Sequence, residues 1–348
     1  MSVPRKKDAA AGPPGRLQMA DIARLAGVST ATVSRALNRS PLVNDETRIR
    51  IEELARSLNY SINVGAQNLR LQQNRTIGVI VPYDSATRQH LSDPFFLSML
   101  GSLADALTDQ GFDMLVSRVD AEQLDAAAKP FDSGRVIGII LIGQWRHHDQ
   151  LNQLAARNVP IVVWGVQLPR QLYCTIGGDN VAGGRLATEH LIAGGRRHIA
   201  FFGDVRLPEV AQRYEGYAMA LAQHGLAPAP EFQISTSFLP QGGTEAVQEM
   251  TRRGLDCDAI FACSDLLAIT SIHALRERGL RIPQDIAVVG YDDIELAAYC
   301  DPPLTTVRQP IQAAGHRLVA ALLALIEGQP SPSQQLDTEL VCRASSAV

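Results

Sequence analysis

The chain has 348 residues, enough for two or three domains, and 46% of them are apolar, so it can bury an ordinary hydrophobic core. No apolar run reaches the roughly 18 residues that a membrane-spanning helix needs. The five cysteines are too widely spaced to suggest a metal or redox pair. We therefore expect no membrane segment, no metal and no other cofactor.

The charge of the chain is distributed unevenly. Residues 1–75 carry twelve basic and six acidic side chains, whereas the whole chain has a net charge of −4, so the remainder is acidic. A basic N-terminal part joined to an acidic body is typical of a protein that binds nucleic acid with one end. Residues 1–17 contain basic side chains, prolines and glycines but no signal-peptide core, which predicts a disordered basic arm and a cytoplasmic protein.

The sequence after this arm has the pattern of a helix-turn-helix. Residues 19–26 predict a first helix, and one face of it carries Ile22, Leu25 and Ala26. Gly27 supplies the left-handed conformation that a tight turn needs, and the hydroxyl of Ser29 can cap a second helix. In that helix Val33 and Leu37 lie four residues apart and face the core. The residues that point outward near its start are Thr30, Ala31, Ser34 and Arg35.

A third helix is predicted to follow. Asn44 and Asp45 can cap it, and its apolar side chains recur with helical spacing at Ile51, Leu54, Ala55 and Leu58. Three short helices within residues 18–62 predict a compact headpiece whose second helix enters the major groove of DNA. The alternative interpretation is an ordinary helical hairpin with a glycine turn.

From Thr76 onward, short apolar runs alternate with helical stretches. Strands are predicted at 77–82, 113–119, 136–142, 160–164, 198–203, 259–262 and 286–291. Helices are predicted at 96–110, 149–157, 183–193, 213–224 and 266–279. This alternation indicates parallel sheets with right-handed crossovers, arranged as two α/β lobes. Ligands of such sheets bind beyond the carboxyl ends of the strands, so the expected binding site is the cleft between the lobes.

An ordered series of motifs from about residue 18 to the end resembles the LacI/GalR family of bacterial transcription regulators. The motifs lie at 21–29, 32–35, 75–80, 93–96, 179–188, 213–217, 288–293, 303–308 and 340–343. The resemblance implies a multi-domain protein: an all-α helix-turn-helix headpiece, a hinge, and a two-lobed core of the periplasmic-binding-protein type that the chain crosses three times. It also implies a homodimer that binds a pseudo-palindromic operator.

The resemblance also implies domain boundaries. Residues 1–17 form the arm, 18–62 the headpiece and 63–76 the hinge. The N-terminal lobe of the core takes residues 77–178 and 308–333, and the C-terminal lobe takes 179–307 and 334–348. The chain ends just past the last strand without the leucine heptads of tetrameric members, which favours a dimer.

The recognition positions of the family give each DNA contact a candidate residue. Bases are expected to be contacted by Thr30, Ala31 and Arg35. Arg35 can bind O6 and N7 of guanine together, whereas Ala31 can only touch a thymine methyl group. Phosphates are expected to be contacted by Ser29, Thr32, Ser34 and Asn38. Each of these can instead be a helix cap or an ordinary surface group.

The hinge of the family forms a short helix only on operator DNA. Its minor-groove wedge corresponds to Leu69, which Arg70 follows. An apolar wedge of this kind unstacks a base step and kinks the duplex. Gly65 weakens a hinge helix by roughly 1 kcal/mol, so we expect the hinge to be disordered away from DNA. The alternative is a plain linker with an isolated leucine.

The effector site is expected in the cleft. Arg213 matches the arginine of the family that holds ligand hydroxyls or carboxylates, and Asp292 matches the acid at a strand end. Phe95 and Phe96 stand at the first strand-to-helix junction, where the family places an aromatic residue beside the ligand. Trp145 and Trp164 follow apolar strand runs and are expected at the cleft mouth, unless they cap the sheet as core residues.

Two positions depart from the family pattern. The first is Gly165, which stands where many members have an acid, and the second is Ser264, a further expected effector contact, which stands where many sugar-responsive members have asparagine. Aromatic faces combined with Arg213 and Asp292 suit a sugar ring, so a neutral mono- or oligosaccharide is the expected effector. Whether this ligand releases the DNA as an inducer or tightens binding as a corepressor remains open, and an inducible repressor is favoured.

Two other classes of protein fit the residues less well. Sugar-binding transport proteins share the fold of the core, but they are exported and have no headpiece. An enzyme on a doubly wound sheet would need a nucleotide loop or a nucleophile with its base. The glycines of residues 177–184 fit neither common phosphate-loop spacing, and no such catalytic set is evident. We therefore expect a regulator rather than an enzyme.

Overall fold

The computed structural model describes residues 19–37, 40–58, 74–85 and 90–347. The chain divides into two compact units, residues 1–73 and 74–348. Several expectations lie outside the described residues: the basic arm, Asn38, and the hinge residues Leu69 and Arg70. No helix in the described ranges is long and apolar enough to cross a membrane.

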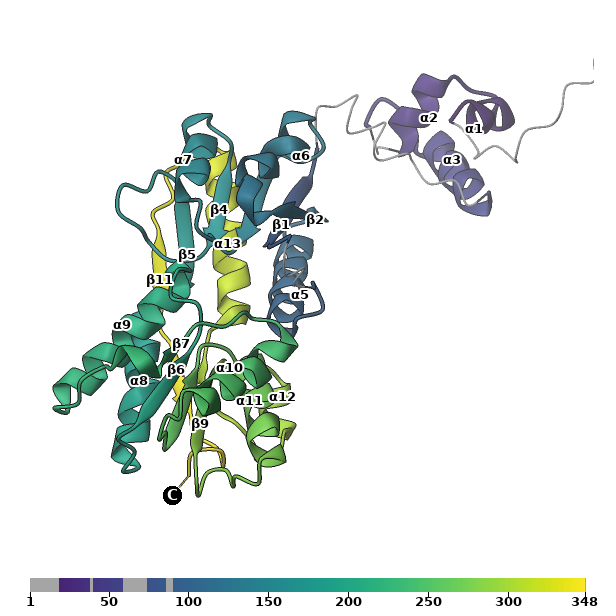
Figure 1. Ribbon diagram of the computed structural model, residues 1–348. Helices are drawn as coiled ribbons and strands as arrows, with labels where there is room; N and C mark the ends of the chain where they lie inside the picture. The colour runs from purple at the N-terminus through teal and green to yellow at the C-terminus, as the bar shows by residue number, and fades with distance from the viewer. Residues whose placement is uncertain (1–18, 38–39, 59–73, 86–89, 348) are drawn as a thin grey trace, which may run out of the picture. The chain divides into compact units, whose positions relative to one another are not determined.

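The first unit contains the three predicted helices, α1 (Met19–Ala26), α2 (Thr30–Leu37) and α3 (Asp45–Ser57) (Figure 1). Its buried core consists of Ile22, Ala23, Val33, Ala36, Val43, Ile51 and Ala55. The expectation for Leu25 is corrected, because its side chain is 55% exposed. Ala23 is buried instead of Leu25, because the face of α1 that packs against α2 and α3 is rotated slightly from the predicted face.

Side-chain caps and one turn fix the ends of these helices. The Ser29 hydroxyl accepts a hydrogen bond from the backbone N–H of Thr32 at 3.1 Å. Asn44 accepts one from the N–H of Thr47 at 2.8 Å. Gly27 has a φ of +66°, which only a glycine adopts readily, and so permits the sharp turn between α1 and α2. The predicted helix-turn-helix is therefore built by the residues that suggested it.

The second unit begins with an N-terminal lobe built on a parallel six-stranded sheet in the order β11-β5-β4-β3-β1-β2. Its strands are β1 (Thr76–Tyr83), β2 (Asp113–Asp120), β3 (Gly138–Ile142), β4 (Ile161–Trp164), β5 (Cys174–Gly178) and β11 (Gln334–Leu336). Its helices are α5 (Pro94–Asp109), η1 (Ala121–Ala128), α6 (Lys129–Asp132), α7 (His148–Ala156) and α13 (Ile311–Ile326). In Figure 1 the yellow α13 lies among the blue and teal elements of this lobe, although it comes late in the sequence.

The C-terminal lobe has a second six-stranded sheet in the order β12-β10-β9-β8-β6-β7. Its strands are β6 (Ile199–Phe202), β7 (Gln233–Ile234), β8 (Ala259–Ala262), β9 (Ala287–Asp292), β10 (Thr305–Arg308) and β12 (Glu339–Val341). Its helices are α8 (Asn180–Ala193), α9 (Pro208–Gln223), η2 (Pro230–Phe232), α10 (Pro240–Arg252), α11 (Asp265–Glu277) and α12 (Leu296–Tyr299). The pairing is parallel except at one edge, where β12 runs antiparallel to β10.

The chain crosses between the lobes three times: after β5, after β10, and between β11 and β12. The crossings touch one another. A Cβ atom on Gly178 would lie 3.1 Å from both Gln309 and Thr338, and the Thr338 hydroxyl donates to the carbonyl oxygen of Asp179 at 3.2 Å. Each crossing thus contributes a residue to one contact point between the lobes.

Two expected lobe boundaries are corrected by the strands. Residues 334–336 form β11, which pairs with β5 in the N-terminal sheet rather than belonging to the C-terminal lobe. Arg308 ends β10 of the C-terminal sheet. Residues 334–336 join the N-terminal sheet because β11 pairs with the edge of β5, where unpaired backbone groups would otherwise remain.

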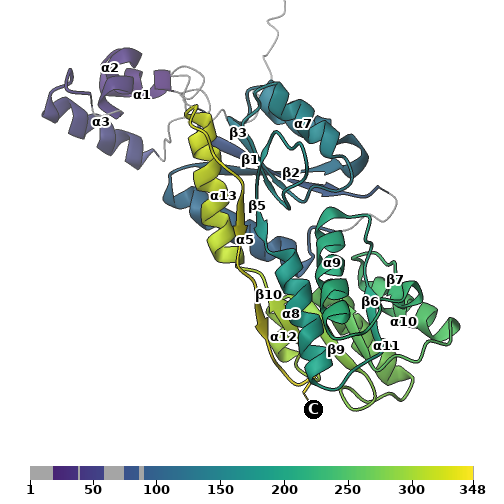
Figure 2. The same ribbon diagram turned by 90° about the vertical axis from the view of Figure 1, so that its left-hand side faces the viewer.

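Close helix packing positions α9, which borders the cleft. α8 and α9 lie side by side in the C-terminal lobe (Figure 2). A Cβ atom on Gly184 of α8 would lie 2.1 Å from the carbonyl oxygen of Arg213, and one on Gly216 of α9 would lie 2.1 Å from that of Val181. Hydrogen atoms at these two positions therefore let the helix backbones approach closely.

Candidate functional site

All seven residues expected at the effector site line one cavity between the lobes of the core: Phe95, Phe96, Trp145, Trp164, Arg213, Ser264 and Asp292. Four of them lie at or soon after the carboxyl ends of β3, β4, β8 and β9, and the other three lie in the first two turns of the helices that follow β1 and β6. Sheet geometry explains this convergence, because the carboxyl ends of parallel strands share one edge.

The aromatic wall of the cavity comes mainly from the N-terminal lobe. Asp93 caps α5 by accepting a hydrogen bond from the N–H of Phe95 at 2.9 Å, and Pro94 begins the helix, so Phe95 and Phe96 lie in its first turn. The ring centroids of Phe95 and Trp164 are 6.5 Å apart. Trp164 is only 5% exposed and packs in the core as well, so it is both a core residue and part of the cavity wall.

Trp145 is held in an unusual backbone conformation. Its φ is +50°, which is uncommon for a residue with a side chain, and it follows Gly143 at φ +100°. Between them Gln144 is fully buried, where it donates to the carbonyl of Val166 at 2.7 Å and accepts from the N–H of Val166 at 2.8 Å. The turn after β3 is therefore fixed by an internal hydrogen-bonded side chain.

The same glutamine explains the first departure from the family pattern. A Cβ atom on Gly165 would lie 2.6 Å from Oε1 of Gln144, so no larger residue fits there while Gln144 is buried. At the second departure, Ser264 caps α11, with its hydroxyl 3.4 Å from the N–H of Leu267. Ser264 thus lines the cavity and also begins a helix.

The C-terminal lobe supplies the cationic group of the cavity. Arg213 is 6% exposed, and its guanidinium donates to Oδ1 of Asn180 at 2.8 Å and to the carbonyl of Cys263 at 2.5 Å. Its Cζ lies 3.7 Å from the ring centroid of Tyr291, a cation–π contact. These contacts fix Arg213 in place before any ligand arrives.

Carboxyl groups outnumber this single cation. Asp93, Glu209 and Asp292 all line the cavity with Arg213. Burial raises the pKa of Glu209 and moves the pKa of Asp292 well above its ordinary value, and the nearby Arg213 opposes both shifts. Asp292 also accepts a hydrogen bond from Gln309 at 2.7 Å.

Among the described residues, no group of carboxylates, histidines or cysteines is arranged to hold a metal ion.

Sequence reasoning missed several residues of this cavity. The missed residues with polar or aromatic side chains are Asp93, Glu209, Phe238 and Gln309. Asp93 and Glu209 look like ordinary charges at the start of a helix, which is how they serve α5 and α9. Gln309 had a usable signal, because it directly follows the motif at 303–308 and thus the end of β10.

Behind the cavity, Asp265 is completely buried. Its carboxyl lies 2.5 Å from the Thr306 hydroxyl and accepts from the N–H of Ile294 at 2.8 Å. Burial raises the pKa of Asp265 to about 7, although these two hydrogen bonds oppose the shift. The folded chain therefore holds this proton at pH values where the unfolded chain has released it.

Stability is expected to decrease as the pH rises from 4 to 7, by up to about 4 kcal/mol for this group, because the folded state binds more protons than the unfolded state there. Asp265→Asn, which resembles the protonated carboxyl, should flatten this part of the pH profile. Asp265→Ala should destabilise by about 2–4 kcal/mol at pH 5, since it leaves the Ile294 N–H unpaired and a cavity behind. The loss should become smaller as the pH rises, because the variant has no buried carboxyl group to ionise. Urea unfolding at pH 5, 6, 7 and 8 measures both effects, and an unchanged slope for Asp265→Asn would contradict the assignment.

The two units together define a class of protein: a helix-turn-helix unit joined in sequence to a two-lobed unit with a cavity between its lobes. Two family models match the chain accordingly. The model of bacterial regulatory proteins of the lacI family covers residues 18–63, and the periplasmic binding protein-like domain covers 188–346.

Known proteins match over nearly the whole chain. The ribose operon repressor of Haemophilus influenzae is 32% identical over 331 residues, which are 93% of this chain and 96% of the relative. The lac repressor dimer bound to operator and the anti-inducer ONPF matches with a TM-score of 0.85 and 28% identity, covering 96% of this chain and all of that one. A complex of the transcriptional regulator CelR with cellobiose matches with a TM-score of 0.71 and 30% identity, covering 95% and 100%. The chain belongs to the LacI family of bacterial regulatory proteins.

Proposed function

We propose that this protein is a transcriptional repressor that binds a pseudo-palindromic operator as a homodimer and is released by a neutral sugar bound in the cavity of the core. In this proposal it has no catalytic activity and acts on DNA in the bacterial cytoplasm. The observation that carries the proposal is the composition of one cavity, in which aromatic rings, the buried Arg213 and the half-buried Asp292 converge from two lobes.

The charges of the cavity support a neutral ligand. Three carboxyl groups line the cavity with one guanidinium, and burial favours the uncharged forms of Glu209 and Asp292. The cavity therefore offers no excess of positive charge that would attract a phosphate or carboxylate ligand. The hydroxyls of a sugar can donate to Asp292 and Glu209 and accept from Arg213, while the C–H faces of its ring pack on aromatic side chains.

The division of the cavity between the lobes supports regulation. The rings of Phe95, Phe96, Trp145 and Trp164 belong to the N-terminal lobe, whereas Glu209, Arg213 and Asp292 belong to the C-terminal lobe. A ligand that needs both sets binds better when the lobes are close together, and such a difference in affinity is what shifts a conformational equilibrium. The same linkage would serve a corepressor, with the difference that the bound sugar would then tighten DNA binding instead of weakening it.

The surface of α2 supports sequence-specific DNA binding. Thr30, Ala31 and Arg35 are exposed, whereas Val33 and Ala36 are buried between the helices. The hydroxyls of Ser29 and Thr32 lie 2.9 Å apart at the start of α2, where phosphate binding is also favoured by the helix end. We assign the phosphate contacts to these residues together with Ser34 and Asn38, and the minor-groove wedge to Leu69 and Arg70.

The test uses the full chain. Duplexes that bind the protein are first selected from a random pool, and the selected duplex is then titrated in a gel-shift assay with and without each sugar of a panel. Thermal unfolding finds the binding sugar, because a ligand at 100 times its Kd adds about 2.7 kcal/mol of stability. We expect a palindromic consensus and release by one sugar. No consensus would refute the DNA-binding proposal, and tighter DNA binding with sugar would make the ligand a corepressor.

Arg35→Ala is expected to weaken binding to the selected operator by roughly 1–3 kcal/mol and to relax the preference at one base pair of each half-site, because a bidentate contact to guanine is lost. Repeating the duplex selection with the variant measures this. Arg24→Ala is the matched control, since it removes an exposed positive charge from α1 instead of α2. If Arg35→Ala weakened binding to random DNA equally, Arg35 would be a phosphate contact.

A further inference from the structure

A second cavity adjoins the one described above. Trp145, Leu207 and Phe238 line both cavities. The first encloses about 110 Å³ and the second about 400 Å³. Because small-molecule sites usually enclose about 300–1,000 Å³, the first cavity alone is small, whereas the second brings the total into that range. The two cavities are therefore parts of one elongated cleft.

The junction of the two cavities is rigid and aromatic. Trp145 packs against the core of the N-terminal lobe and is half-buried, with the positive φ described above. Backbone strain of this kind persists only where the surroundings impose it, and it is concentrated at binding sites. Phe238 reaches the same junction from the C-terminal lobe. The rings of Trp145 and Phe238, one from each lobe, can pack against a ligand where one sugar unit is joined to the next.

The far end of the cleft contains a fixed charged pair. Arg206 binds Asp204 with both Nε and Nη2, at 2.7 and 2.8 Å. Burial tends to raise the pKa of Asp204, but the hydrogen bonds from Arg206 outweigh this effect and the pKa is lowered. The carboxylate is therefore ionised at neutral pH, and donor and acceptor groups stand side by side.

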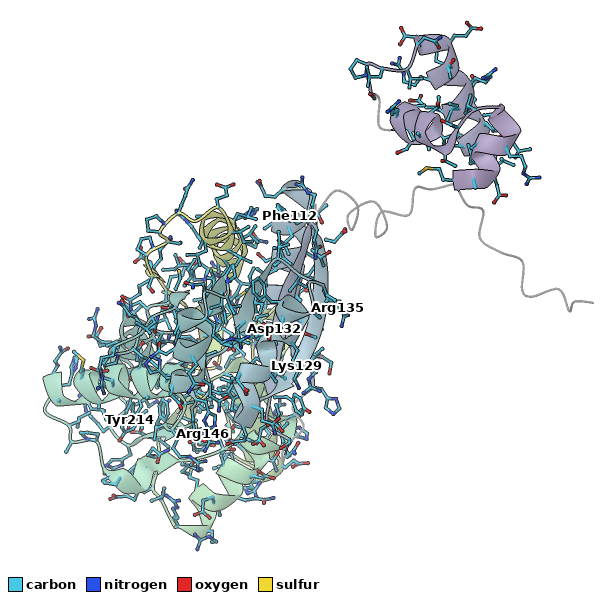
Figure 3. The ribbon with its side chains drawn as sticks, turned by 90° about the horizontal axis from the view of Figure 1, so that it is seen from above. Phe112, Lys129, Asp132, Arg135, Arg146 and Tyr214 are labelled. Carbon is cyan, nitrogen blue, oxygen red and sulfur yellow. The ribbon has the colours of Figure 1, made fainter. Side chains whose placement is uncertain are left out.

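Further polar groups line this end of the cleft. Within the described ranges, the hydroxyls of Ser235 and Ser237 and the guanidinium of Arg146 make no side-chain hydrogen bond or ion pair, and all three residues line the second cavity. Figure 3 labels Arg146, which comes from the turn after β3. Paired charges together with free hydroxyls match sugar hydroxyls, each of which both donates and accepts.

We propose that the cleft binds a neutral oligosaccharide of at least two units, with one unit in the cavity of Arg213 and Asp292 and the next unit, beyond Trp145, in the cavity of Arg206. This inference rests on the proposed function and makes it narrower, because it selects an oligosaccharide over a single sugar. Contacts to Asp204, Arg206 and Arg146 then contribute affinity that no monosaccharide can use.

The test is isothermal titration of the full chain with a panel of sugars. The panel contains glucose, galactose, mannose and xylose, and the disaccharides cellobiose, maltose, lactose, melibiose, mannobiose and xylobiose. We expect one disaccharide to bind at least about tenfold more tightly than either of its component monosaccharides. A monosaccharide that binds as tightly as every disaccharide containing it would overturn the second subsite and leave the proposed function intact. If no sugar of the panel binds, both proposals fail.

Variants test the assignment of residues. Arg206→Ala and Arg146→Ala should each lower the ratio of disaccharide to monosaccharide affinity by roughly ten- to a hundredfold, the range for hydrogen bonds to charged groups. Arg281→Ala is the matched control, because Arg281 binds Asp285 in the same two-pronged way at 2.7 and 3.0 Å and lines neither cavity. A uniform loss of affinity for both sugars, with the ratio unchanged, would mean that Arg206 and Arg146 only stabilise the fold and would overturn the inference.

Discussion

Asp292→Ala is expected to abolish the response to the sugar while the protein still binds its operator. The carboxyl of Asp292 lies in the cavity, where two hydroxyl contacts to it would contribute more than about 2.7 kcal/mol, so sugar affinity should fall at least about a hundredfold. The substitution is far in sequence from α2, to which we assign the base contacts. Titrating the variant with sugar, in the presence and absence of operator DNA, measures both properties.

Two further measurements make this prediction decisive. Asp301→Ala is the control, because Asp301 is an exposed carboxylate of the same lobe that pairs with Arg276 at 2.7 Å. In the unmodified protein, operator DNA should change sugar affinity by the same factor by which sugar changes operator affinity, as linkage requires. If Asp292→Ala still released the operator when sugar was added, both the site and the coupling proposed for it would be wrong.

Gly216→Ala is expected to destabilise the core by about 3 kcal/mol or more. The added Cβ would lie 2.1 Å from the carbonyl oxygen of Val181 and 2.7 Å from the backbone nitrogen of Arg185, so α8 and α9 must separate. Because α9 carries Glu209 and Arg213, sugar binding should weaken along with stability. Urea unfolding and isothermal titration of the same preparation measure the two effects.

A second helical glycine provides the control for this substitution. A Cβ on Gly101 of α5 would have no atom within 4 Å, so Gly101→Ala should stabilise the core by about 0.5–1 kcal/mol through helix propensity alone. Equal effects of the two substitutions would show that close packing of α8 on α9 contributes nothing. A destabilised Gly216→Ala protein with normal sugar affinity would show that the position of α9 is not critical for the cavity.

The sequence predicted those elements whose signals are local. Ser29 and Asn44 are caps at the positions expected, and the strands with continuous apolar runs, such as β1 and β3, were found. α13 is an exception, because it was not predicted although its alanine- and leucine-rich sequence carries a local helical signal. β5 and α10 were not predicted either. β5 ends in two glycines and α10 begins with Pro240 and two glycines, so neither carries a strong propensity, and tertiary packing determines both.

The candidate site was predictable where family motifs marked it and not where the fold alone creates it. Arg213 and Asp292 belong to motifs, and the structure places both in the cavity. Gln144 gives no such signal, because its buried hydrogen bonds to Val166 depend on a segment 22 residues away in sequence. α9 also begins at Pro208 rather than Arg213, so the sequence pattern did not reveal that Glu209 lies one turn before Arg213.

The three crossings between the lobes have a mechanical consequence. Gly178, Gln309 and Thr338 each belong to a different crossing, and they lie close together where the three crossings pass one another. Because the three crossing segments contact one another at one place, a change in the angle between the lobes must involve all three together. Gln309 at this contact point also donates to Asp292, and Asn180 beside it accepts from Arg213, so these two cavity residues are hydrogen-bonded to the segments that connect the lobes. A molecule that fills the cavity therefore acts directly on residues that are hydrogen-bonded to the segments between the lobes.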